Sequence, residues 1–222
     1  MKCRTLHSWD VTPREAIVIQ GRLARRVRPV WDGRPVRIVA GADVAFPDRS
    51  TVLAAVAVMT YPGLEIIETH ATTTRCTFPY VPGLLAFREA PGLLAVLETL
   101  KTQVDVLMCD AQGLAHPRGM GLATHVGILV DVPVVGCAKS RLCGEFGKLG
   151  QRKGSKAYLR DASGKVIGTA LRTRGRVRPV YVSVGNRIDL RKAIEIVLAC
   201  APKYRIPEPL RAAHRLSIGE AV

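Results

Sequence analysis

The chain has 222 residues, of which 48% are hydrophobic, and a formal net charge of +15 at pH 7. A chain of this length and apolar content can bury a core, so we exclude a disordered tail and expect one domain over residues 1–222. The longest apolar run, 52–59, is too short for a membrane helix, and the N-terminus lacks a signal peptide's apolar stretch, so no membrane partner is expected.

The N-terminal part of the chain predicts a helix followed by an antiparallel meander. Thr12 and Glu15 form a capping box around Pro13, so a helix should run from Pro13 to Arg26. Three strand-like runs follow, joined by short turns that contain Pro, Asp or Gly, at 36–46, 50–62 and 64–74.

The rest of the chain alternates helices with apolar strands. A helical region is expected over 83–101, with Pro91 opening its longer second part. The runs 104–110 and 132–139 flank a helix near 119–130, and their unbroken apolar character indicates parallel strands covered on both faces. The last expected elements are three strands and two helices, at 156–160, 166–173, 178–184, 189–200 and from Pro209 onward.

This order of elements predicts an α/β protein with a central mixed sheet flanked by helices. An antiparallel three-strand meander would lead into parallel strands through right-handed connections. The order resembles the ribonuclease H-like fold, in which the first and fourth strands lie side by side in the centre of the sheet.

The six cysteines form no C-x-x-C pair, and Cys109 and Cys137 lie in apolar strand-like runs. Small buried thiols are typical of this pattern, whereas a zinc site or a disulfide framework is not. A reducing, cytoplasmic location is therefore expected.

Positive charge is concentrated at two places in the sequence. Residues 1–37 hold nine Lys or Arg against three acids, and residues 139–178 hold twelve against two, while residues 38–138 hold five against nine. This pattern favours a phosphate-binding surface around a carboxylate site, although a solvated, arginine-rich surface would give the same counts. The run 148–156 is either a contact to a phosphate backbone or a solubilising loop.

Three acids stand where a metal site could form. Asp43 lies inside an uncharged strand, where a carboxylate is costly unless it is paired or binds a cation, and Asp110 closes a second buried strand. If the two strands are neighbours, both acids meet at one edge of the sheet, and Glu89 at the start of a helix supplies a third corner. Three carboxylates suit Mg²⁺, with Mn²⁺ able to substitute, and such an ion can activate water against a phosphodiester.

The same acids also have structural interpretations that the residues leave open. Asp43 could cap a turn, Asp110 could cap a helix, and Glu89 could be a solvated acid in a first helical turn. Asp105 opens its strand, so it ranks below the other three, as a structural acid or one behind the metal ligands.

Four motifs at ordered separations resemble the endonuclease V family, the deoxyinosine-specific repair nucleases. They are GADVAF (41–46), FPYVPGLLAFRE (78–89), DAQGLAHPRGMGLATHVG (110–127) and GCAKSRLCG (136–144). The resemblance covers nearly the whole chain and implies that Asp43, Glu89 and Asp110 bind metal. It also implies that His214 lies close to the metal and that Lys139 stabilises phosphate charge, although the residues alone would place both at a solvated surface.

The resemblance further implies that Pro79, Tyr80, Val81 and Pro82 form a wedge that opens the duplex while the damaged base turns into a pocket. Gly83 and Leu85 would line that pocket. Ala111 stands where family members often have glycine, and its methyl group would limit how closely the backbone approaches the base. His116 and Arg118 are candidates for contacts to base or phosphate, with loop capping as the alternative. Arg88 is grouped with Arg118 and Asp105 as a residue behind the ligands or a phosphate contact.

The implied activity is Mg²⁺-dependent cleavage of the second phosphodiester 3′ to a deoxyinosine, leaving 3′-hydroxyl and 5′-phosphate ends. The expected partner is damaged DNA containing deoxyinosine, and the expected state is a monomer. One alternative is an endoribonuclease that acts on inosine in RNA, because the sequence does not distinguish the two substrates. Another is a nucleic-acid-binding protein without catalysis, whose acids are structural.

Overall fold

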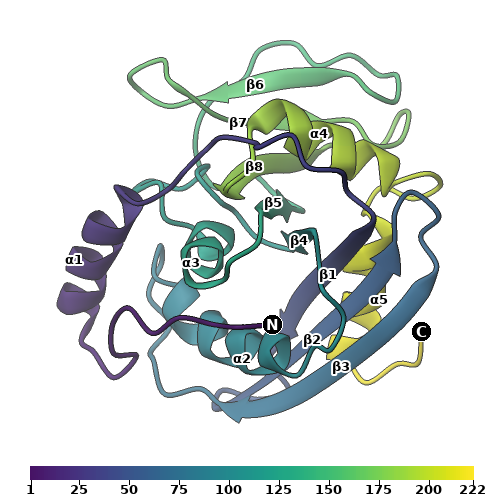
Figure 1. Cartoon of the computed structure of the whole chain (residues 1–222). Helices are drawn as coiled ribbons and strands as arrows, with labels where there is room; N and C mark the ends of the chain where they lie inside the picture. Colours follow the sequence, from purple (N-terminus) through teal and green to yellow (C-terminus); the bar gives the residue numbers. More distant parts are fainter.

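The computed structural model describes residues 1–222 and contains one eight-stranded sheet with helices on both faces (Figure 1). In chain order the elements are α1 (Pro13–Ala24), β1 (Ile38–Ala45), β2 (Thr51–Thr60), β3 (Ile66–Arg75), α2 (Ala86–Glu98), β4 (Val106–Cys109), α3 (Leu122–Leu129), β5 (Val134–Ala138), β6 (Lys156–Arg160), β7 (Val166–Leu171), β8 (Val180–Asn186), α4 (Leu190–Ala199) and α5 (Glu208–Ser217). None of these helices is long and apolar enough to cross a membrane.

The strand order is β3-β2-β1-β4-β5-β8-β7-β6, which places the first and fourth strands side by side. β1 pairs antiparallel with β2 and parallel with β4, and β4 pairs parallel with β5. This arrangement confirms the predicted ribonuclease H-like fold. In the β1–β4 register Ala42 faces Cys109, so Asp43 and Asp110 follow at the same edge.

Parallel pairing ends at β5. The last three strands all pair antiparallel, β8 with β5, β7 with β8 and β6 with β7. The connections between β6, β7 and β8 are short turns without a helix, which suits antiparallel neighbours. The parallel half expected from the sequence is therefore limited to β1, β4 and β5.

The helix boundaries agree with the sequence signals except around Pro91. Thr12 and Glu15 form the predicted capping box at the start of α1. Pro91, however, lies inside a single helix, α2, instead of opening a second one, so that part of the prediction was wrong. Proline donates no backbone hydrogen bond, yet the burial of α2 against the sheet keeps the helix continuous.

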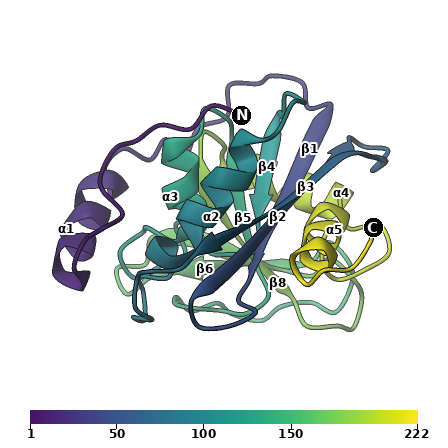
Figure 2. The ribbon, with the colours of Figure 1, turned by 90° about the horizontal axis from the view of Figure 1, so that it is seen from below.

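Two helix layers cover the sheet (Figure 2). On one face, α2 and α3 pack through Leu93, Leu97 and Val126 against apolar residues of β1, β2 and β4. On the other face, α4 and α5 pack through Ile196 and Leu210. α1 lies outside α2 and α3, in contact with both.

All six cysteines are free. Cys109 and Cys137 are buried, which confirms the prediction of small buried thiols, and Cys200 is buried as well.

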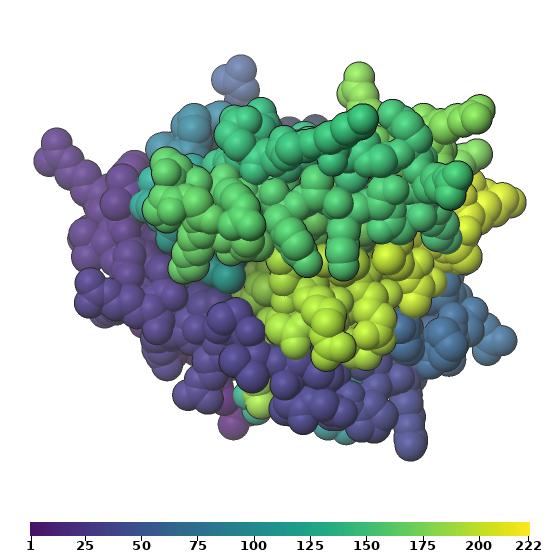
Figure 3. Space-filling model, turned by 90° about the horizontal axis from the view of Figure 1, so that it is seen from above, coloured from purple at the N-terminus to yellow at the C-terminus, as the bar shows by residue number.

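The strongly basic segment 139–178 begins at the end of β5 and includes β6 and β7. Figure 3 shows this segment, in green, spread over one face beside the C-terminal helices in yellow.

Candidate active site

Three carboxylates from separate elements line one cavity of about 430 Å³. Asp43 belongs to the end of β1, Asp110 directly follows β4, and Glu89 lies in the first turn of α2. Lys139, which directly follows β5, lines the same cavity. The structure thus brings together the three acids and the lysine that the sequence analysis singled out.

Each aspartate has a cationic or polar partner at the cavity edge. Lys139 Nζ lies 2.5 Å from Asp110 Oδ2, the distance of an ion pair. That oxygen is buried and accepts no hydrogen bond of regular geometry, so the contact is mainly electrostatic. Asp43 Oδ2 lies 2.7 Å from His214 Nδ1 and accepts a 3.2 Å hydrogen bond from Ser217 Oγ.

His214 and Ser217 reach Asp43 because α5 approaches β1 unusually closely. A Cβ atom at Gly41 would lie only 2.2 Å from the backbone carbonyl of Pro209 at the start of α5. Only glycine fits at this contact. The glycine two residues before Asp43 therefore sets the distance at which the α5 side chains meet the carboxylate.

Burial and mutual repulsion shift the protonation of the acids. The pKa of Glu89 is raised to about 8, first by burial and then by the charges of Asp43 and Asp110. The pKa of Asp110 is also raised by burial, which the neighbouring Lys139 partly opposes. The cluster therefore favours the uptake of a proton or a cation.

The donor set suits a hard divalent cation, although the side chains do not yet converge on a point. Carboxylate oxygens are the ligands that Mg²⁺ prefers. No group of three or more His, Cys, Asp or Glu side chains is arranged so that it could hold a metal ion. Ion binding would therefore require the carboxylate side chains to turn toward a common point.

An exposed aromatic side chain stands beside the carboxylates. Tyr80 is 71% exposed and, with Val81 and Pro82, lines the same cavity. Pro79 is not part of the lining. The preceding backbone is held by Arg88, whose Nη1 donates a 2.7 Å hydrogen bond to the carbonyl of Phe78.

The loop after the aromatic tip is held at Gly83. Its φ of +78° is in the left-handed region that favours glycine. Its carbonyl accepts hydrogen bonds from Arg118 Nη2 (2.6 Å), Gln20 Nε2 (3.0 Å) and His116 Nε2 (3.1 Å). Burial and the charge of Arg118 lower the pKa of His116 to about 4, so its imidazole is neutral and Nε2 carries the proton.

Leu85 and Ala111 line the same cavity as Gly83 and His116. The pocket expected for an extruded base therefore adjoins the carboxylates. Ala111 directly follows Asp110 and lines the cavity beside it.

Three residues grouped with the site by the sequence have structural contacts. Asp105 lies at the opposite end of β4, where its Oδ2 accepts hydrogen bonds from the backbone amides of Arg37 and Ile38, at 2.8 and 2.9 Å. Arg118 holds Gly83, and Arg88 holds Phe78 and covers the ring of Phe46. None of the three lines the cavity, and their assignment as residues behind the metal ligands or as phosphate contacts stays a prediction.

Sequence reasoning missed several supporting residues. Ser217 contacts Asp43, and Gln20 connects α1 to Gly83. Arg205 Nη2 donates to the carbonyl of Lys139 and so fastens the backbone that carries the lysine. Single polar residues on helices and loops carry no spacing signal, so nothing in the sequence could have selected them.

Comparisons with known proteins agree with this geometry. The sequence profile of the family Endonuclease V matches residues 22–215. An Endonuclease V of Methanothrix thermoacetophila is 50% identical over 221 residues, covering 100% of this chain and 97% of that protein.

Two solved structures are similar over almost the whole chain. The crystal structure of Endonuclease V from Streptomyces avermitilis has a TM-score of 0.89 and 41% identity, covering 98% of this chain and 96% of that one. Endonuclease V of Ciona intestinalis, in complex with a 24mer DNA containing an inosine followed by a ribo-adenosine, has a TM-score of 0.82 and 26% identity, covering 92% and 95%.

Proposed function

Because this chain belongs to the endonuclease V family, we propose that it is a DNA-repair endonuclease that acts on deoxyinosine. It hydrolyses the second phosphodiester on the 3′ side of the lesion and leaves 3′-hydroxyl and 5′-phosphate ends. The observation that carries this proposal is that Asp43, Glu89 and Asp110 line the same cavity as the aromatic tip at Tyr80.

Asp43, Glu89 and Asp110 would hold Mg²⁺, with Mn²⁺ able to substitute. Bound there, the ion would supply positive charge to the phosphodiester and lower the pKa of the attacking water. The raised pKa of Glu89 supports this assignment, because a cation would offset the repulsion among the three acids.

The remaining side chains position the substrate. Lys139 places its ammonium beside Asp110, where it stabilises charge on the phosphate, and His214 orients Asp43 through the 2.7 Å contact. No side chain serves as a covalent nucleophile.

The segment around Tyr80 opens the duplex. An exposed ring on a proline-braced tip can stack in the space that the base leaves, which offsets part of the cost of extrusion. The base then lies between Gly83, Leu85, Ala111 and His116, which line the adjoining part of the cavity.

Incision of a labelled duplex with one deoxyinosine tests the proposal. We expect one cut at the stated bond with Mg²⁺, no cut in EDTA and none by Asp43→Ala. Full incision by Asp43→Ala, or persistence in EDTA, would overturn the metal assignment. Metal-independent binding without cleavage would instead support a non-catalytic nucleic-acid-binding protein.

Inosine in RNA is the second candidate substrate. The DNA in the Ciona intestinalis complex carries a ribo-adenosine directly after its inosine. DNA and RNA oligonucleotides of one sequence, compared at equal salt, distinguish the two substrates.

We propose that the chain acts as one catalytic domain over residues 1–222, as a cytoplasmic monomer.

A further inference from the structure

A second cavity, of about 360 Å³, lies at the opposite end of the sheet from the carboxylates. Asp131 lines it and precedes β5, whereas Lys139 follows β5. Asn186 also lines it, and this last residue of β8 pairs with Val134 at the start of β5. The two cavities are therefore separated by the length of a central strand.

The second cavity is lined by five arginines and a single acid, Asp131. The arginines come from the N-terminal segment, the connection after α1 and the end of β8: Arg4, Arg25, Arg26, Arg28 and Arg187. We call this group the arginine cavity. Its lining carries four more positive than negative charges.

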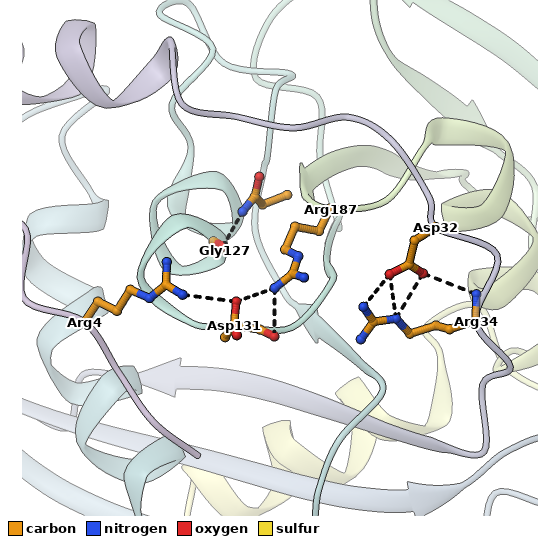
Figure 4. Close-up of polar contacts among 7 residues, drawn as sticks. Arg4, Asp32, Arg34, Gly127, Asp131 and Arg187 are labelled. Atoms are coloured by element: carbon orange, nitrogen blue, oxygen red, sulfur yellow. Dashed lines mark hydrogen bonds and ion pairs between the residues drawn. The ribbon is translucent and has the colours of Figure 1, made fainter.

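The one acid is already shared. Figure 4 shows Arg4 and Arg187 approaching Asp131 from two sides. The nearby Asp32 is bound by Arg34 and does not line the cavity. The guanidinium groups of Arg25, Arg26 and Arg28 have no hydrogen-bond or ion-pair partner, and all three residues are exposed, so they are free to bind an anion.

The wall of the arginine cavity is fixed by hydrogen bonds from separate elements. Asn186 Oδ1 accepts from the amide of Arg28 at 2.8 Å, and Asn186 Nδ2 donates to the carbonyl of Gly127 at 2.6 Å. The amide of Arg187 donates to the carbonyl of Arg28 at 2.6 Å. The backbone that carries Arg28 and Arg187 is therefore fixed before a ligand binds.

Helix stability alone does not explain the cluster. Cations near a helix C-terminus interact favourably with the helix dipole, which accounts for Arg25 and Arg26 after α1. Arg4, Arg28 and Arg187 belong to no final helical turn. Arg4 and Arg187 share the one acid, Asp131, so neither helix stability nor ion pairing accounts for Arg28 or for the excess of four positive charges.

The lining also indicates the class of ligand. Guanidinium groups match phosphate oxygens through paired hydrogen bonds. The cavity contains no aromatic side chain on which a base could stack. We propose that the arginine cavity binds a run of adjacent phosphate groups, recognised through the phosphates alone and independently of the carboxylate site.

Calorimetric titration with sodium tripolyphosphate in EDTA tests this inference. The double variant Arg26→Gln/Arg28→Gln should bind at least about tenfold more weakly than the wild type, because it loses two charged donors. Arg174→Gln/Arg176→Gln removes the same charge from exposed positions elsewhere and should change affinity by less than about twofold. Lys139→Ala should also retain binding.

Several results would overturn the inference. They are equal affinity in the wild type and Arg26→Gln/Arg28→Gln, equal losses in the two double variants, or loss of binding in Lys139→Ala alone. Thermal unfolding and deoxyinosine incision should be unchanged in Arg26→Gln/Arg28→Gln, which separates this inference from the proposed nuclease function.

Competition identifies the source of the phosphates. If an undamaged single-stranded oligonucleotide displaces tripolyphosphate from the wild type, the natural ligand is a nucleic-acid backbone. If it does not, while tripolyphosphate still requires Arg26 and Arg28, the ligand is a free polyphosphate.

Discussion

The two ends of the central sheet gather opposite charges, and burial decides what each end can do. At one end, Asp43, Glu89 and Asp110 line a cavity in which the pKa of Glu89 rises to about 8, so its charge responds to protons and cations. At the other end, five arginines, four of them exposed, line a cavity with Asp131, and arginine stays charged throughout the physiological pH range. The acidic end is suited to metal-dependent catalysis, whereas the basic end is suited to binding phosphate through a charge that does not change with pH.

Glu89→Gln should separate activity from stability at the acidic end. Loss of one carboxylate ligand should reduce deoxyinosine incision roughly a thousandfold, equivalent to several kcal/mol of transition-state stabilisation. The melting temperature should rise, because a neutral amide is less costly to bury than a carboxylate and also removes the repulsion from Asp43 and Asp110. Incision rates and thermal unfolding measure the two effects.

The stability gain should depend on pH with a definite sign. The folded-state pKa of Glu89 lies above its ordinary value of 4.5, so the protonated form favours folding and stability is lost as pH rises from 4.5 through 8. The advantage of Glu89→Gln should therefore grow over this window. Glu98→Gln, an exposed position on the same helix, is the control and should change neither quantity.

The next largest expected difference between the two ends is in how incision and tripolyphosphate affinity depend on pH. Deprotonation of Glu89 is required before it can bind metal, so incision should rise by up to about a hundredfold from pH 6 to 8 at limiting Mg²⁺. Higher Mg²⁺ should move the midpoint to lower pH. Tripolyphosphate affinity should stay flat across the same range, and a parallel rise in both would remove the distinction between the ends.

Tyr80→Ala should reduce the preference for deoxyinosine over deoxyadenosine about tenfold, since stacking of one base on an aromatic ring contributes about 1–3 kcal/mol. Stability should be unchanged, because the ring is 71% exposed. Competition between the two duplexes measures the preference. Tyr158→Ala removes another exposed ring, on β6, and an equal loss in that variant would count against the wedge.

Gly41→Ala should have the smallest effect on incision, of several-fold. Its Cβ would clash with Pro209, which displaces α5 and its contacts to Asp43 and destabilises the fold by about 1–3 kcal/mol. Denaturant unfolding measures this loss. Gly21→Ala on α1 meets no atom within 4 Å and should be neutral or slightly stabilising, so a similar loss there would contradict the close-approach argument.

The central part of the fold was predictable because its signals are local. Uninterrupted apolar runs before Asp110 and around Asp43 indicated buried strands, and the order of elements then made those strands neighbours. The direction of β6, β7 and β8 was not predictable in this way, because strand composition does not specify the pairing partner. It follows from the turns that join them.

Residues of the site could be predicted only where the residue type is energetically costly at its position in the sequence pattern. A carboxylate within a buried strand, as at Asp43, requires compensation, whereas Ser217 and Arg205 would be ordinary at any surface. The contacts of Arg118 and Asp105 could not be predicted, because their partners are backbone groups distant in sequence, at Gly83 and Ile38. Such contacts appear only after the chain has folded.

Direct measurement of Mn²⁺ binding by electron paramagnetic resonance tests the central claim most directly. The wild type should bind Mn²⁺ saturably, Mg²⁺ should displace it, and Asp110→Asn should reduce the affinity at least about tenfold while Asp105→Asn does not. Equal Mn²⁺ affinity in the wild type and Asp110→Asn would contradict the assignment of the acidic end as the metal site.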